Sequence, residues 1–171
     1  MRSILVLVSF CLSSIGIAQK PQSSPAHPSK MSATVANEMQ GYKLKLDVLH
    51  TFDTINASFD RLASRNAIFT GRYEAFQAVM DGTAKSINET ASPFGLRFPE
   101  ADAAIRKAGF STRQYLLVYC IVMEAYLNLD APVGSKFPPG LSQANVDLLR
   151  TNSDLTRPIV QHVVKQQSGV E

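Results

Sequence analysis

The chain has 171 residues, of which 45% are hydrophobic and 18% are charged, and its formal net charge is +3. Basic residues are scattered along the chain, without the stripe or cluster that a nucleic-acid-binding protein usually shows. These values indicate a globular protein with a sizeable core, and we expect no nucleic-acid partner.

Residues 1–18 have the layout of a secretory signal peptide. A charged start is followed by an apolar stretch, residues 4–12, and by small residues that end at Ala18. This layout predicts cleavage after Ala18 and export to the periplasm or the extracellular space. The apolar stretch is too short to span a bilayer, which takes about 20 apolar residues. Phe10 before Cys11 does not fit a lipid-attachment site, so we expect an exported protein without a membrane span.

Export would leave Cys120 as the single cysteine, so packing rather than an internal disulfide is expected to hold the fold. Residues 19–40 are rich in proline, serine and alanine, which predicts a disordered arm. We expect one helical domain over residues 41–167 and a short tail, residues 168–171.

Apolar residues at helical spacing predict a first helix over residues 46–64 and a second over residues 69–91. The apolar stripe of the first is Val48, Phe52, Ile55, Phe59 and Leu62, and that of the second is Phe69, Tyr73, Phe76, Met80, Ala84 and Ile87. Asp81-Gly82 leaves open a kink or a split in the second helix. Pro93 is expected to end it.

Capping residues mark the helices that follow. Pro99 predicts the first position of a short third helix, which Gly109 closes. Ser111 and Gln114 form a capping-box pattern, which predicts a fourth helix over about residues 111–129. The body of this helix is apolar on nearly every side, so we expect the other helices to surround it.

A long loop over residues 130–141 precedes the last two predicted helices, and loops of this length often carry function. Ser142 caps a fifth predicted helix, and a sixth is predicted over residues 156–166 with Pro158 in its first turn. No stretch alternates convincingly as a strand would. The predicted fold class is therefore all-α, a compact bundle of five to six helices around the helix at about 111–129.

The sequence lacks the motifs of common catalytic and metal sites. It has no Glu-x-x-His, no His-Glu-x-x-His and no Gly-x-Ser-x-Gly. His50 and Asp53 share a helix face without a third ligand nearby, and His162 stands among valines. Cys120 lies in an apolar helix, which is typical of an inert core residue. We therefore predict no catalytic, metal-binding or cofactor-binding residues.

Glu124 is the most unusual charged residue, because it follows nine apolar residues. At 100° per residue it forms a thin polar edge with Arg113 and Asn128. One interpretation is an edge that surfaces between neighbouring helices. The other is a buried carboxylate with a perturbed pKa that lines a cleft.

Three tyrosines lie on the opposite side of the same predicted helix. Tyr115, Tyr119 and Tyr126 fall within about 40° of one another by helical geometry. They either pack in the core with their hydroxyl groups on polar partners or line a small-molecule pocket. Together with Glu124 they are the candidate pocket-lining residues.

Two segments, residues 107–117 and 141–150, carry a family resemblance. In the first a short helix ends in Ala-Gly and a capped apolar helix follows; the second is a capped helix containing Asn145. This pattern resembles a group of small exported bacterial proteins of unknown function. The resemblance covers about the C-terminal half and implies a compact helical domain exported by a bacterium, with no activity or catalytic residues to carry over.

The function expected from these observations is non-catalytic binding of a protein partner or a small ligand outside the cytoplasm. A second hypothesis is an enzyme that uses Glu124 as a general acid or base in a helical cleft. A third is a structural or assembly protein that associates with itself through the helix face from Val48 to Leu62.

Overall fold

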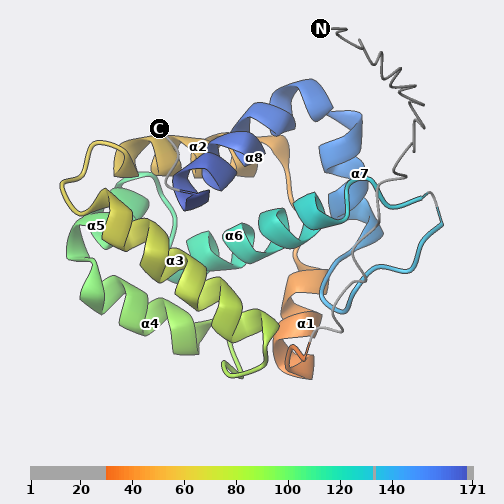
Figure 1. The fold of residues 1–171 in the computed structure, drawn as a ribbon, viewed down its shortest axis with the longest axis horizontal. Helices are drawn as coiled ribbons and strands as arrows, with labels where there is room; N and C mark the ends of the chain where they lie inside the picture. The colour runs from red at the N-terminus through yellow and green to blue at the C-terminus, as the bar shows by residue number, and fades with distance from the viewer. Residues whose placement is uncertain (1–29, 133, 169–171) are drawn as a thin grey trace, which may run out of the picture.

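The computed structural model describes residues 30–132 and 134–168, and this part of the chain folds into eight α-helices without a β-strand (Figure 1). The all-α prediction is confirmed, whereas the expected number of five to six helices is too low. The helices are α1 (Ala33–Gly41), α2 (Leu46–Phe59), α3 (Arg65–Met80), α4 (Asn88–Arg97), α5 (Pro99–Lys107), α6 (Thr112–Leu127), α7 (Gln143–Thr151) and α8 (Ser153–Ser168). The expected signal peptide, residues 1–18, lies outside the described residues.

Part of the expected disordered arm is helical, so that prediction is wrong for residues 33–40. The Ser32 side chain accepts a hydrogen bond from the backbone N–H of Val35 at 3.3 Å and caps α1. Val35 and Met39 are fully buried, and Glu38 pairs with Arg113 of α6. Proline and serine are concentrated before residue 30, whereas the apolar residues four apart that follow supply a buried helix face.

The helix expected over residues 69–91 is split into α3 and α4, as Asp81-Gly82 allowed. Gly82 has φ +77°, and a Cβ atom there would lie 2.3 Å from the backbone oxygen of Lys30. The position therefore needs glycine both for its backbone conformation and for space. The Asp81 carboxylate accepts a hydrogen bond from the backbone N–H of Thr83 at 2.8 Å and stabilises the turn.

Pro93 does not end a helix, contrary to the prediction, but lies inside α4. Proline has no N–H group, so the carbonyl group of Glu89, four residues earlier, lacks its usual helical hydrogen bond. This side of α4 is exposed, so that carbonyl group can bond to water instead. The third and sixth predicted helices correspond to α5 and α8, with Pro99 at the first turn of α5 and Pro158 inside α8.

Helix α6 is buried along most of its length, since Thr112 and every residue from Tyr115 to Ala125 are buried. It packs against α1, α3, α4, α5, α7 and α8. The predicted cap is confirmed, because Ser111 Oγ accepts a hydrogen bond from the backbone N–H of Gln114 at 3.1 Å. The Gln114 side chain donates to the hydroxyl group of Tyr42 at 3.4 Å.

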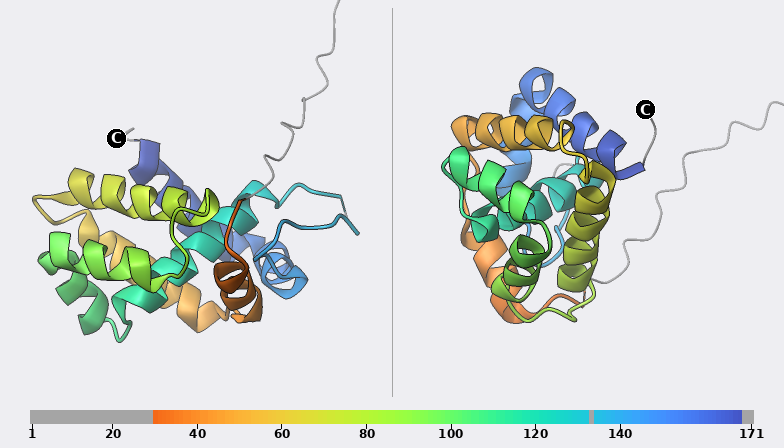
Figure 2. Two further views of the ribbon diagram at one scale, coloured as in Figure 1. Left: turned by 90° about the horizontal axis from the view of Figure 1, so that it is seen from below. Right: turned by 90° about the vertical axis from the view of Figure 1, so that its left-hand side faces the viewer.

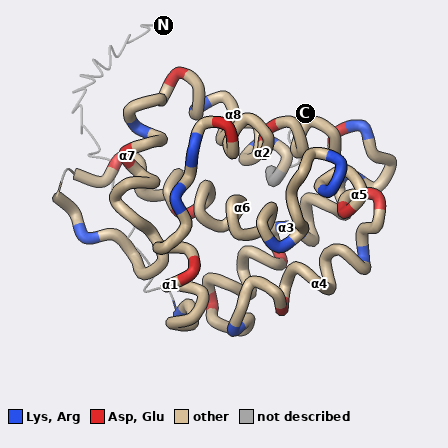
Figure 3. The backbone as a smooth tube through the Cα atoms, turned by 180° about the vertical axis from the view of Figure 1, so that it is seen from behind, with Lys and Arg blue, Asp and Glu red and all other residues tan. Residues whose placement is uncertain are grey.

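Two further pairs of helices pack against each other. Helices α3 and α4 lie side by side, as do α2 and α8 (Figures 1 and 2). Helix α7 contacts both α6 and α8. Acidic and basic residues are distributed over the described helices rather than gathered by sign (Figure 3). Among these helices none is long and apolar enough to cross a membrane.

Candidate functional site

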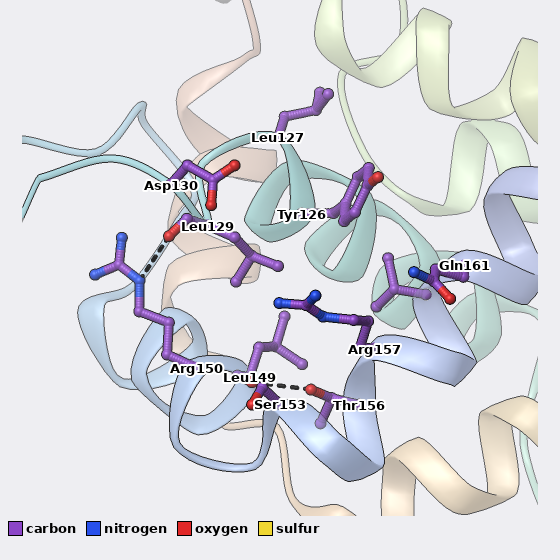
Figure 4. Close-up of a pocket in the computed structure, with 11 residues that line it drawn as sticks. Tyr126, Leu127, Leu129, Asp130, Leu149, Arg150, Ser153, Thr156, Arg157 and Gln161 are labelled. Atoms are coloured by element: carbon purple, nitrogen blue, oxygen red, sulfur yellow. Dashed lines mark hydrogen bonds between the residues drawn. The ribbon is translucent and has the colours of Figure 1, made fainter.

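A pocket of about 720 Å³ opens where the end of α6 meets α7 and α8 (Figure 4). This volume lies within the range of about 300–1,000 Å³ that is usual for small-molecule sites. Its lining residues are Tyr126, Leu127, Leu129, Asp130, Leu149, Arg150, Ser153, Thr156, Arg157, Val160 and Gln161. They come from three segments, namely the end of α6 with the residues after it, α7, and the first half of α8.

The base of the pocket is apolar. Leu149 of α7 and Val160 of α8 are almost fully buried, with 1% and 2% exposure. At the rim Leu127 is 65% exposed and Tyr126 is 37% exposed. These two side chains extend the apolar surface of the pocket to its rim.

Arg150 fixes the wall formed by the end of α6. Its Nε atom donates to the carbonyl oxygen of Leu129 at 2.9 Å, and its Nη2 atom donates to that of Ala131 at 2.6 Å. A further contact reaches the carbonyl oxygen of Asn128 at 3.3 Å. Helix ends leave such carbonyl groups without partners, and a basic side chain can satisfy them. The guanidinium group of Arg150 is therefore engaged by the backbone.

Thr156 fixes α8 against α7. Its hydroxyl group donates to the carbonyl oxygen of Leu149 at 2.9 Å, and the residue is only 3% exposed. This bond joins the two helices at the base of the pocket and sets their relative position there.

Arg157 extends into the pocket toward Leu149 and Leu129 (Figure 4). None of the ion pairs or hydrogen bonds in the described part of the chain uses its guanidinium group. Asp130 lines the other side of the pocket beyond Leu129 and is likewise in none of these ion pairs. The pocket thus holds a guanidinium group that is not committed to a carboxylate.

The three tyrosines that were candidates for core packing or for lining a pocket lie in different environments. Tyr126 lines this pocket, whereas Tyr115 and Tyr119 are fully buried. The Tyr115 ring packs against Phe52 and Phe59 at centroid distances of 5.4 and 5.5 Å. Burial raises the pKa of both buried phenols, so they stay protonated.

Glu124 is buried, with 8% exposure, and does not line this pocket. Burial raises the pKa of its carboxyl group. Within the described ranges its carboxylate accepts no hydrogen bond, so no partner for acid–base chemistry is placed beside it. Burial also raises the pKa of the nearby Cys120 thiol, and the negative charge of Glu124 adds to this effect. Cys120 is thus an unreactive core residue, as predicted.

His162 of α8 contacts two aspartates, Asp53 of α2 and Asp60 directly after it, and this contact was not predicted from the sequence. His162 Nδ1 lies 3.2 Å from Asp53 Oδ1, and His162 Nε2 lies 2.8 Å from Asp60 Oδ2. The aspartates are seven residues apart, about two helical turns, so the imidazole bridges them and the three groups do not converge on one point. Among the described residues no cluster of three potential ligands fits a metal ion.

A buried arginine lies behind this bridge and was also missed. Arg72 of α3 is fully buried and donates from Nη1 to Asn56 Oδ1 at 2.6 Å and to the hydroxyl group of Tyr115 at 3.0 Å. A third bond reaches Gln166 Oε1 at 3.2 Å, and the guanidinium carbon lies 4.5 Å from the centre of the Tyr119 ring. In the described part of the chain the Nε and Nη2 atoms of Arg72 have no hydrogen-bond partner. The only sequence signal is the position of Arg72 between Ile68 and Ala75–Phe76, on the buried face of α3.

Neither a protein-family model, nor a curated protein, nor a solved structure matches this chain.

Proposed function

We propose that this protein is a non-catalytic binding protein that takes a small organic ligand into the pocket between α6, α7 and α8. The observation that supports this proposal is the pocket of about 720 Å³ with Leu149 and Val160 at its base. An apolar base with a few polar groups at the rim is the usual composition of a small-molecule site.

The lining of the pocket supports binding rather than catalysis. Nucleophilic catalysis by a hydroxyl group needs a base within hydrogen-bonding reach. The lining has three hydroxyl groups, those of Tyr126, Ser153 and Thr156, and the last already donates to the carbonyl oxygen of Leu149. It contains neither histidine nor cysteine. Glu124, the candidate acid or base, is not among the lining residues.

The self-association hypothesis is less well supported than ligand binding. Its helix face includes Phe52, Ile55 and Phe59, each with 0–1% exposure within a single chain. Helix α2 packs against α5 and α8, so most of this apolar face is already covered. A second copy would find little apolar surface there.

We also propose that α6 is the helix around which the bundle is organised, and that binding takes place in the periplasm or outside the cell. The first proposal is supported by the many helices that α6 contacts. The second is supported by the signal-peptide layout of residues 1–18. Detection of the expressed protein in the cytoplasm with residues 1–18 intact would contradict export.

A thermal-shift screen of a library of organic acids, amines and neutral compounds tests the binding function. A ligand at 100 times its Kd stabilises the folded state by about 2.7 kcal/mol, which corresponds to a rise in Tm of about 5–10 °C. Gln161→Trp places a large ring at the exposed rim of the pocket, and Gln77→Trp is the matched control on an exposed position of α3. We expect compounds that shift wild type and Gln77→Trp but not Gln161→Trp. A screen without such compounds contradicts the proposal.

A further inference from the structure

We propose that the ligand of this pocket is an amphipathic organic anion with a single acidic group, which pairs with Arg157 while its apolar body covers Leu149 and Val160. This inference rests on the binding function proposed above and adds the chemical class of the ligand.

The charges of the pocket favour an anionic ligand. Two arginines and one aspartate line it, so the lining carries a positive balance. Arg150 donates to three backbone carbonyl groups, and its hydrogen-bonding capacity is largely used. Arg157 enters no ion pair or hydrogen bond among the described residues. It is therefore the cationic group that is ready to receive an anion.

The chemistry of the guanidinium group selects the acidic head. Its planar array of N–H donors matches the two oxygen atoms of a carboxylate in a bidentate geometry. Asp130 lies on the other side of the pocket beyond Leu129 (Figure 4). A second negative charge on the ligand would be repelled there, so a monoanion fits better than a dianion.

The apolar part of the ligand follows from the position of Arg157 on α8. Arg157, Val160 and Gln161 are three and four residues apart and share one helix face. Arg157 is exposed, and its guanidinium group lies over the pocket and points toward Leu149 and Leu129 (Figure 4). An anion held by Arg157 is thus placed beside apolar side chains, and a ligand with an alkyl or aromatic body gains further burial.

Isothermal titration calorimetry with decanoate and with decanol, its uncharged counterpart, tests the inference on the full chain. Arg157→Gln removes the charge and Arg157→Lys keeps it, while Arg61→Gln is a control that changes the net charge equally at an exposed position outside the pocket. Thermal melts establish that all variants are folded, which we expect because the side chain of Arg157 makes no ion pair or hydrogen bond with any residue that the structure describes.

We expect wild type to bind decanoate about 10- to 100-fold more tightly than decanol, as for a hydrogen bond to a charged group. Arg157→Gln should lose this preference, Arg157→Lys should keep part of it, and Arg61→Gln should match wild type. Equal binding of decanoate and decanol by wild type, or full decanoate affinity in Arg157→Gln, would overturn the anion class. If neither probe binds although the library screen finds a pocket ligand, the anion class alone is refuted; if that screen also fails, the binding function is refuted with it.

Discussion

Replacing Gly71 with alanine tests how closely α3 approaches the junction of α4 and α5. A Cβ atom at Gly71 would lie 2.3 Å from Cε2 and 2.8 Å from Cζ of Phe98. Ordinary contacts of a Cβ atom fall at 3.4–4 Å, so the ring would have to move by more than 1 Å. Phe98 is 5% exposed and its ring centre lies 5.1 Å from that of Phe94, so the ring has little room to move.

The expected loss of stability follows from two opposing terms. Overpacking a well-packed site costs about 1–3 kcal/mol, whereas alanine is better than glycine in a helix interior by about 1 kcal/mol. The overlap with Phe98 is large, so the overpacking term should lie near the top of its range. We expect Gly71→Ala to lose about 1–2 kcal/mol, which for a chain of this size lowers Tm by about 2–8 °C.

Urea unfolding followed by circular dichroism measures this change. Gly41→Ala is the matched control, because a Cβ atom at Gly41 meets nothing within 4 Å. We expect this control to be neutral or slightly stabilising. Adding Phe98→Leu to Gly71→Ala should recover part of the loss, since it removes the atoms that collide. If Gly71→Ala is as stable as Gly41→Ala, the close approach of these helices is wrong.

Three further substitutions test other contacts. Asn145→Ala removes an amide that bonds to two backbone groups between α1 and α2 at 3.0 and 2.9 Å. Urea unfolding should show a loss of stability of about 2–3 kcal/mol. This loss should be well above that of Asn152→Ala, whose amide bonds only to the last turn of the adjoining helix α7. Burial raises the pKa of the Glu124 carboxyl group above its ordinary value of 4.5, so its ionised form is disfavoured in the folded state. The stability of the fold should therefore fall as the pH rises from 4.5 through the raised pKa. Glu124→Gln should therefore melt at a higher temperature than wild type at pH 8 and at a similar temperature at pH 4; an equal gain at both would contradict this cause. His162→Ala removes the contacts to Asp53 and Asp60 and should lower the free energy of unfolding by about 1 kcal/mol, after allowance for partial exposure. His50→Ala, at an exposed position, is the control. A similar loss of stability in this control would contradict a specific role of the bridge.

Helix starts that depend on a local cap were predictable from the sequence. The side chains of Ser111 and Ser142 accept hydrogen bonds from the backbone N–H groups of Gln114 and Asn145 at 3.1 and 3.2 Å. Such a bond spans three residues, so the residues that decide it are neighbours in the sequence. The predicted starts of α6 and α7 were therefore right to within about one residue.

Elements that depend on distant contacts were not predictable in this way. Helix α1 is short, and Val35 and Met39 are buried only because the rest of the chain covers them. Its Glu38 pairs with Arg113, which lies 75 residues away. The composition of the preceding segment indicated disorder, and nothing local to residues 33–40 revealed these partners.

The candidate site was only partly visible in the sequence. Tyr126 was selected as the last member of a row with Tyr115 and Tyr119, and it alone lines the pocket. The row is divided because α2 and α3 supply the aromatic neighbours of the first two tyrosines, whereas the last turn of α6 extends beyond them. Arg157 lies about 30 residues further along, and its position opposite Tyr126 depends on the packing of α7 against α8.

The predicted apolar stripe of α3 was right for Phe69 and Phe76, but a charged residue that the prediction left out shares its buried face. Tyr73, expected inside, is 39% exposed, while Arg72 is fully buried. The partners of Arg72 are Asn56, Tyr115 and Gln166, from α2, α6 and α8, and each of them is unremarkable in its own segment. A slip of α8 by one turn would carry Gln166 about 5.4 Å away. It would leave the buried guanidinium group with one partner fewer, which the low-dielectric interior penalises. The polar contacts of Arg72 thus favour one register of α8 among several that the apolar residues would accept.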